Sequence, residues 1–175
     1  MTAIARQLAR LIAAKPVTGP DLEAAALLTL DALANAVAGV NSQPGGILLK
    51  AHAAGAPFGR AFVIGALTHI HETDDLHRAS VVHPGCVVVP AAWALAERLG
   101  ADGPSTLKAI IWGFEAACRV GASVGPAHYR IWHNTATCGP FGGAAAGASL
   151  LDLSEDAFAW ALGNAGTQSS GLWEF

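Results

Sequence analysis

The stretch PDLEAAALLTLDALANAVAG, residues 20–39, decides the fold class of this chain. It opens with a proline and two acids, as the first turn of a helix does, and Gly39 stands where a helix C-cap would stand. Between these signals, apolar side chains recur at intervals of three and four residues, at Leu22, Ala26, Leu30, Leu33 and Val37. The spacing predicts one long helix with an apolar stripe.

Helix signals continue on both sides of this stretch, and residues 1–15 have the pattern of an amphipathic first helix. Further helices are predicted over 44–55, over 60–70, from about Pro90 to Leu99, from Pro104 to about 121–125, over 135–151 and from the cap at 154–156 to about Gly163. A turn is expected at Pro57-Phe58-Gly59, and residues 71–85 and 128–134 have no helical period. With no strand or repeat pattern, we expect one all-α domain over residues 1–175, with roughly eight helices.

The composition is apolar for a protein of this size. The chain has 175 residues, of which 53% are hydrophobic and 13% charged, and its mean hydropathy is +0.41. We therefore expect apolar surface that faces another surface. The longest uncharged run, residues 131–151, contains histidine, proline and several glycines, so it is a poor membrane-spanning helix.

Charge and cysteine usage narrow the function classes. The net charge is −3 and the ten basic residues are scattered, so no nucleic-acid partner is expected. The first residues lack the separate charged and apolar regions of a signal peptide, which favours a cytoplasmic protein with no membrane partner. Cys86, Cys118 and Cys138 are too far apart for a metal cluster and odd in number, so we expect buried thiols.

Residues 69–85, HIHETDDLHRASVVHPG, hold four of the seven histidines and three acids. The residue types suit a metal site, although the spacing matches no strong metal signature. They equally suit an acid/base site, in which Arg78 would anchor a substrate carboxylate. A solvated ion-pair loop without chemistry explains the composition as well, and the residues alone leave all three interpretations open.

A second candidate is HYRIWHNT, residues 128–135, where aromatic, cationic and imidazole groups alternate just before a helix rich in small residues. A packed aromatic loop is the simpler explanation. Two polar loops in one apolar domain nevertheless favour a shared pocket. The small residues of the following helix are expected where another helix or a substrate approaches closely.

Several ordered motifs resemble the MmgE/PrpD family, which includes 2-methylcitrate dehydratase and cis-aconitate decarboxylase. The segments are TLDALANAVAGV, GALTHIHETDDLHRASVVHPG, VVPAAWALAERLGADG, IIWGFEAACRVG, WHNTATCGPFGGAAAGASLLDLS and ALGNAGTQSSGL, so the resemblance begins at about residue 20. It implies an all-helical domain and, in complete members, an α/β lid domain that this chain lacks. It also implies homodimers, and chemistry on small polycarboxylates without a metal or other cofactor.

The resemblance implies site residues one by one. His83 and His133 match two active-site histidines of the family, and Glu72 falls where decarboxylase-like members have an active-site aspartate. Asp75 is a further catalytic candidate, and Asp74 precedes it in the family's aspartate pair. His77, Arg78 and Asp74 would bind substrate, and His77 and Arg78 would also determine specificity. His69 and His71 are expected to be structural.

Two departures separate the chain from the family pattern. Leu76 stands where many members have a threonine, and the chain lacks a lysine- and histidine-containing segment that family members carry just beyond its last residue. Its own lysines, Lys15, Lys50 and Lys108, lie far from the motifs. The chain therefore looks incomplete, as a fragment, a truncated product or one half of a split enzyme.

The leading hypothesis is a lyase or isomerase subunit that removes a proton next to a carboxylate of a small polycarboxylate, in dehydration, decarboxylation or epimerisation. A homodimer or a partner chain would supply the missing half. The alternative is a catalytically silent helical dimerisation or interaction domain, which the missing lysine segment and Leu76 both favour.

Overall fold

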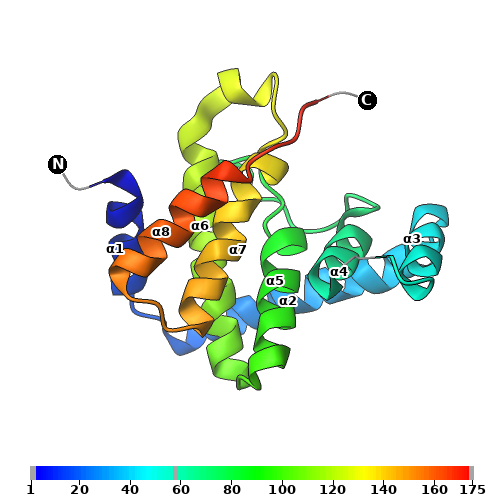
Figure 1. The fold of residues 1–175 in the computed structure, drawn as a ribbon, viewed down its shortest axis with the longest axis horizontal. Coiled ribbons are helices and arrows are strands. Elements are labelled where there is room, and N and C mark those ends of the chain that lie inside the picture. The colour runs from blue at the N-terminus through cyan, green and yellow to red at the C-terminus, as the bar shows by residue number, and fades with distance from the viewer. Residues whose placement is uncertain (1–2, 57–58, 174–175) are drawn as a thin grey trace.

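A computed structural model describes residues 3–56 and 59–173, and the turn expected at Pro57-Phe58-Gly59 falls largely outside them. The described residues form eight helices and only isolated β-bridges, which confirms the all-α prediction (Figure 1). The helices are α1 (Ile4–Ala14), α2 (Gly19–Val40), α3 (Gln43–Ala53), α4 (Arg60–His69), α5 (Gly85–Leu99), α6 (Gly103–Tyr129), α7 (Asn134–Leu150) and α8 (Glu155–Thr167).

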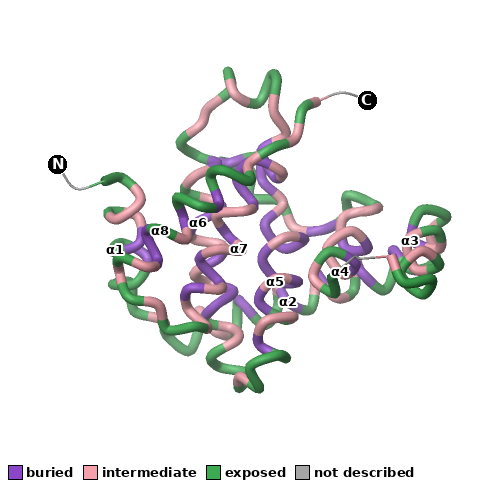
Figure 2. The backbone as a smooth tube through the Cα atoms, in the orientation of Figure 1, coloured by how far each residue is buried: buried purple, intermediate pink, exposed green. Residues whose placement is uncertain are grey.

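Helices α5, α6 and α7 form the centre of the molecule (Figure 2). α6 and α7 approach most closely where Gly113 faces Gly142, because a Cβ on Gly113 would lie 2.9 Å from the carbonyl oxygen of Gly142. The same added Cβ would lie 2.3 Å from a methyl group of Val88 on α5. At Gly142, the small side chain of α7 therefore allows close helix packing, which is one of the two reasons that the sequence offered.

α2 crosses one end of this centre and contacts α4, α5 and α6. Its buried face carries small residues, namely Ala25, Thr29, Ala32, Ala36 and Gly39. Much of the apolar stripe that defined the helix in the sequence is exposed, with Leu30 63% and Val37 68% accessible, and the neighbouring Leu27 69% accessible. The helix is thus apolar on both sides, and its bulkier side chains face outward.

α2 is also the one described helix that is long and apolar enough to cross a membrane, and 28% of its apolar window is buried. A helix at the centre of a bundle passes the same test. Here the Asp31 carboxylate of α2 accepts the backbone N–H of Asp75 at 3.1 Å, which ties the helix to the loop before α5.

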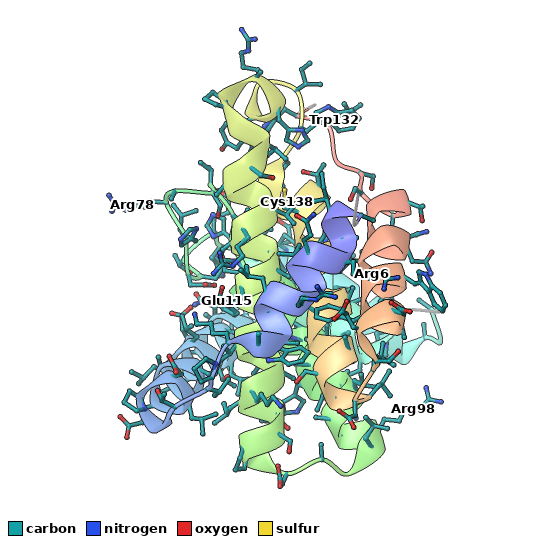
Figure 3. The ribbon with its side chains drawn as sticks, turned by 90° about the vertical axis from the view of Figure 1, so that its left-hand side faces the viewer. Arg6, Arg78, Arg98, Glu115, Trp132 and Cys138 are labelled. Atoms are coloured by element: carbon teal, nitrogen blue, oxygen red, sulfur yellow. The ribbon has the colours of Figure 1, made fainter. Side chains whose placement is uncertain are left out.

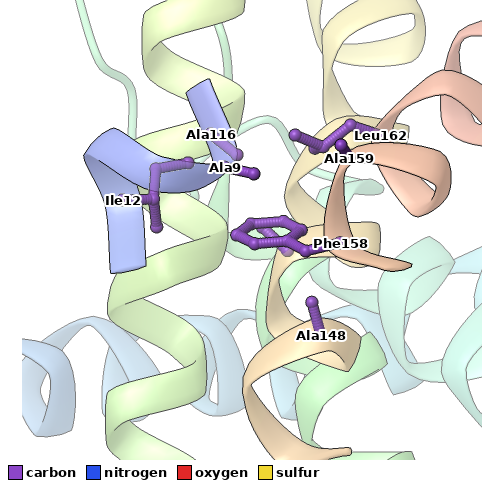
Figure 4. Close-up of a cluster of buried hydrophobic side chains, with 8 residues drawn as sticks. Ala9, Ile12, Ala116, Ala148, Phe158, Ala159 and Leu162 are labelled. Carbon is purple, nitrogen blue, oxygen red and sulfur yellow. The ribbon is translucent and has the colours of Figure 1, made fainter. Parts of the chain in front are cut away.

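α1 and α8 cover the opposite side of the centre. Ile12 of α1 and Phe158 and Leu162 of α8 are buried against α6 and α7 (Figure 4). Arg10 pairs with Glu155 at 2.7 Å along the exposed edge of this contact. Exposed pairs of this kind contribute about 1 kcal/mol or less, so the apolar contact holds α1 in place.

α5 begins earlier than the sequence predicted. The proline signal placed Pro90 in its first turn, but the helix starts at Gly85 and Pro90 lies inside it. Pro90 has no N–H to donate to the carbonyl of Cys86, and that carbonyl instead faces α4. A Cβ on Gly65 of α4 would lie only 2.7 Å from it, so the missing hydrogen bond coincides with the closest approach of the two helices.

The three cysteines are free thiols. Cys86 and Cys138 are buried, as expected, whereas Cys118 is half-buried. Burial raises the pKa of the Cys118 thiol to about 11 and raises that of Cys86 and Cys138 as well. All three are held as neutral thiols near pH 7, which makes them weak nucleophiles.

Candidate functional site

Two connections far apart in the sequence meet to form the site. The first joins α4 to α5 and the second, residues 130–133, joins α6 to α7. The Thr135 hydroxyl accepts the backbone N–H of His83 at 3.0 Å. The buried Asn134 side chain donates to the carbonyl of Ser80 at 2.8 Å. These two bonds fix the start of α7 against the first connection.

The glycine that ends the His-Pro-Gly sequence of the first connection has a structural role. The Asp75 carboxylate accepts the backbone N–H of Gly85 at 2.8 Å, at the start of α5. A Cβ on Gly85 would lie 2.2 Å from that carboxylate, so the position requires glycine. Burial raises the pKa of Asp75 to about 6, although the hydrogen bond from Gly85 opposes the shift. Asp75 therefore caps α5 in this structure.

Three histidines gather beside a buried carboxylate, and two of them lie against it. The His69 ring lies 4.8 Å from that of His83 and 6.1 Å from that of His133, centroid to centroid. Asp74 is 5% exposed, and one of its oxygens lies 3.0 Å from Nδ1 of His69 and 3.5 Å from Nδ1 of His83. We call His69, Asp74, His83 and His133 the histidine cluster.

The histidines of this cluster differ in their electrostatics. The hydrogen bond to Asp74 raises the pKa of His69, against the opposing effect of its burial. Burial lowers the pKa of His133, and the nearby imidazoles of His69 and His83 lower it further. The cluster therefore holds one imidazole that favours its charged form and one that favours its neutral form, as a site for proton transfer requires.

The backbone of the first connection is strained at two non-glycine residues. Glu72 and Val81 both have φ of +50°, in the left-handed region. For a β-branched residue such as Val81 this conformation is an outlier. Strain of roughly 1–3 kcal/mol per residue persists where the surrounding structure enforces it, and it is concentrated at functional sites.

The structure does not bring every predicted site residue to the cluster. Arg78 is exposed and projects from the molecule (Figure 3). His77 bonds Ser80 at 2.8 Å through Nδ1 and lines a different groove, between α2 and α6. Leu76 is exposed, and Glu72 is exposed at the edge of the cluster. Asp74, predicted to bind substrate, is buried behind two histidines instead.

The structure brings His69 into the cluster, where the sequence placed only His83 and His133. His69 was expected to be structural because it ends a predicted helix, and it is indeed the last residue of α4. That position places its ring over Asp74, five residues later, through a turn that the sequence shows only as loop. The signal that was available is the spacing of His69 and Asp74 on either side of the helix end.

A pocket of about 440 Å³ adjoins the cluster. It lies between α4, α5 and the start of α7, and His69, His133 and Thr135 line one end. The rest of its lining is almost entirely apolar, from residues such as Phe62 and Val87. A small molecule in this pocket would meet two imidazoles and a threonine hydroxyl as its main polar contacts.

Comparison with known proteins decides the family. The MmgE/PrpD N-terminal domain matches residues 56–175, which include both connections of the site. The chain belongs to the MmgE/PrpD family. The match begins later than the residue-20 start that the sequence motifs suggested, so α1, α2 and α3 lie outside it.

Two curated relatives carry cis-aconitate decarboxylase in their names. The chain is 35% identical over 125 residues to a cis-aconitate decarboxylase-like protein, oryM, of Aspergillus oryzae, and 33% identical over 123 residues to the cis-aconitate decarboxylase of Aspergillus terreus. Each match covers 66% of this chain, and 26% and 25% of the respective relative. The matched region thus spans about a quarter of these relatives.

Three residues of the histidine cluster are of the types that bind metal ions. His69, Asp74 and His83 offer ligand-type atoms that lie within 4.8 Å of one another. Hydrogen bonding and ion pairing between these side chains account for the arrangement without an ion. Of the lysines, Lys15 pairs with Glu115 and Lys108 lies over the ring of Trp112, so both are engaged away from the cluster.

Proposed function

We propose that this chain provides part of the active site of a lyase or isomerase that acts on a small polycarboxylate. The reaction class is removal of a proton next to a carboxylate, as in dehydration, decarboxylation or epimerisation. The observation that carries the proposal is the histidine cluster, in which His69 and His83 lie against one buried carboxylate and His133 lies beside the ring of His69. Membership of the MmgE/PrpD family and the names of the relatives support the same class.

The chemistry requires a proton acceptor and a positive group for the enolate-like charge that develops. His133 suits the acceptor, because its lowered pKa keeps it neutral near pH 7. His83 lies beside it with Nδ1 buried, and this arrangement leaves Nε2 as the nitrogen for a ligand. Glu72, at the exposed edge of the cluster, would assist proton transfer. No metal or other cofactor is part of this proposal.

The experiment is a turnover assay of the purified chain on 2-methylcitrate, citrate and cis-aconitate. The chain is measured alone and together with any chain encoded next to it, since a homodimer or a partner chain is proposed to complete the site. Product formation on any of the three, abolished by His133→Gln, supports the proposal. No turnover in any combination would falsify it.

The second candidate is a silent dimerisation or interaction domain. One observation favours it specifically: the outer face of α2 exposes Leu27, Leu30 and Val37 in the absence of any partner. Exposed Leu76 and the outward projection of Arg78 also weaken substrate binding by this chain alone. A stable oligomer that binds no polycarboxylate in calorimetry would establish this candidate instead.

A further inference from the structure

We propose that Asp74 is a positioning residue that holds His69 and His83 by their Nδ1 atoms, and that His69 is the third histidine of the site and carries its positive charge. The assignment takes its chemical role from the proposed function. Its geometry stands independently of any reaction, because it follows from contacts within the chain.

Asp74 is buried. Its side chain has no solvent exposure, and a buried carboxylate must be paired or hydrogen-bonded to be stable. Both ion pairs of Asp74 within the described residues go to imidazoles, those of His69 and His83. Asp74 cannot touch a substrate from this position, so its effect on one would pass through the two rings.

Asp74 lies next to the Nδ1 atoms of both His69 and His83. Nδ1 of His69 lies 3.0 Å and 3.2 Å from the two carboxylate oxygens of Asp74. A histidine that donates through Nδ1 to a carboxylate is held in one tautomer and one orientation, with Nε2 left for a ligand. Nδ1 of His83 is buried, has no hydrogen-bond partner among the described residues, and lies 3.5 Å from the same carboxylate.

The proposed reaction needs a positively charged group near the pocket. Stabilising an anionic intermediate requires a cationic donor. Lys15 and Lys108 are engaged elsewhere. The described residues that line the pocket include imidazoles but no lysine or arginine, so an imidazole is the cationic group that the lining supplies. His69 lines the pocket and is the imidazole closest to Asp74, whose hydrogen bond favours its charged form.

The surroundings of His69 all bear on its protonation. Acids from its own connection favour the charged form, and burial opposes it. The titratable groups that face it are Glu72, Asp74 and Asp75 from the connection, His83 before α5, Cys86 on α5 and His133 at the start of α7.

The test is ¹⁵N NMR of the histidine rings in the purified chain across pH, without substrate. In the wild type, His69 is expected to titrate above the ordinary histidine value of about 6.5 and to carry its proton on Nδ1 when neutral. Asp74→Asn is expected to lower the His69 pKa, since the amide keeps the shape of the carboxylate without its charge. The control Asp152→Asn, at an exposed acid after α7, is expected to change neither quantity.

Three results would overturn the proposal. The first is a His69 titration that Asp74→Asn leaves unchanged, and the second is a neutral wild-type His69 with its proton on Nε2. The third result is tight binding of stoichiometric Zn²⁺ that shifts the His69 and His83 signals together, which would make the cluster a metal site. If Asp74→Asn does not fold, the wild-type spectrum alone decides between these outcomes.

The outcome is separable from that of the proposed function. A chain that shows the expected titration and converts no polycarboxylate keeps the positioning role and loses the lyase proposal. A chain that is active but fails the titration test loses only the positioning role. In an active chain, Asp74→Asn is further expected to move the alkaline limb of the pH–rate profile to lower pH.

Discussion

The Thr135 hydroxyl accepts the backbone N–H of His83 at 3.0 Å, across 52 residues of sequence. Thr135→Val keeps the shape of the side chain and removes the acceptor. An unpaired, partly buried N–H costs roughly 1–3 kcal/mol, so we expect a loss of about 1–2 kcal/mol in the free energy of unfolding. Thr135→Ser keeps the hydroxyl and is the matched control in urea titrations. Equal stability of the two variants would contradict the role of this bond.

Asp75 makes stability depend on pH. Its pKa is about 6 in the folded chain against an ordinary value of 3.8, so the folded state binds the proton more tightly than the unfolded state. Stability is therefore expected to fall as pH rises between about 4 and 6, by an amount on the order of 2 kcal/mol. Asp75→Asn, whose amide oxygen can still accept from Gly85, is expected to remove most of this slope. Thermal melts at a series of pH values measure it, and an unchanged slope would sink the idea.

The crossing of α6 and α7 depends on the absence of a side chain at Gly113. Gly113→Ala places a methyl group against Val88 and against the Gly142 carbonyl, so we expect destabilisation of roughly 1–3 kcal/mol. Gly163→Ala on α8 is the control, because that position is exposed and has open space around it. The control is expected to stabilise the chain by up to about 1 kcal/mol, since alanine is the better helix former.

Removing an imidazole from the cluster tests the chemistry. If the chain is active, His133→Gln is expected to reduce turnover by about 10²–10⁴-fold, the usual contribution of a positioned acid or base. His52→Gln is the control, since His52 is exposed on α3. Turnover numbers for both variants decide the matter, and comparable loss in the two would show that the cluster has no special role.

The outer face of α2 is expected to drive self-association. Fully burying a leucine contributes roughly 1.5–3 kcal/mol, so Leu27→Ser together with Leu30→Ser is expected to weaken an oligomer strongly. Trp160→Ser is the control, because Trp160 is 73% exposed on α8, away from α2. Light scattering after size exclusion gives the mass of each variant. The same mass for wild type and the double variant would locate the association elsewhere.

Helix positions followed well from the sequence because their signals are local. The proline and acid in the first turn of α2, Ser154 before α8 and the turn after Leu99 each mark a helix boundary through a local residue. The start of α5 could not be predicted, since Asp75 rather than a local residue caps it. The buried face of α2 could not be predicted either. Small residues are buried there because neighbouring helices approach closely, whereas the larger apolar side chains are exposed.

The site was predictable only in part for the same reason. His83 and His133 fell in stretches whose composition stood out, and the structure brings them together through Thr135. Their chemical roles stay predictions. The contact of His69 with Asp74 could not be predicted because it is made through a turn. Arg78 and His77, predicted to bind substrate, lie outside the cluster. Side-chain direction in an irregular loop is set by tertiary contacts that no period encodes.

The backbone of Gly125 has a consequence for mutational tolerance. With φ of 69° and ψ of 179°, it occupies a region that is essentially open to glycine alone, and it bends α6 eight residues before His133. A Cβ at this position would meet no neighbouring atom, so the restriction is purely conformational. In a saturation mutagenesis screen, variants of Gly125 should therefore behave like variants of the histidines, although the residue carries no functional group.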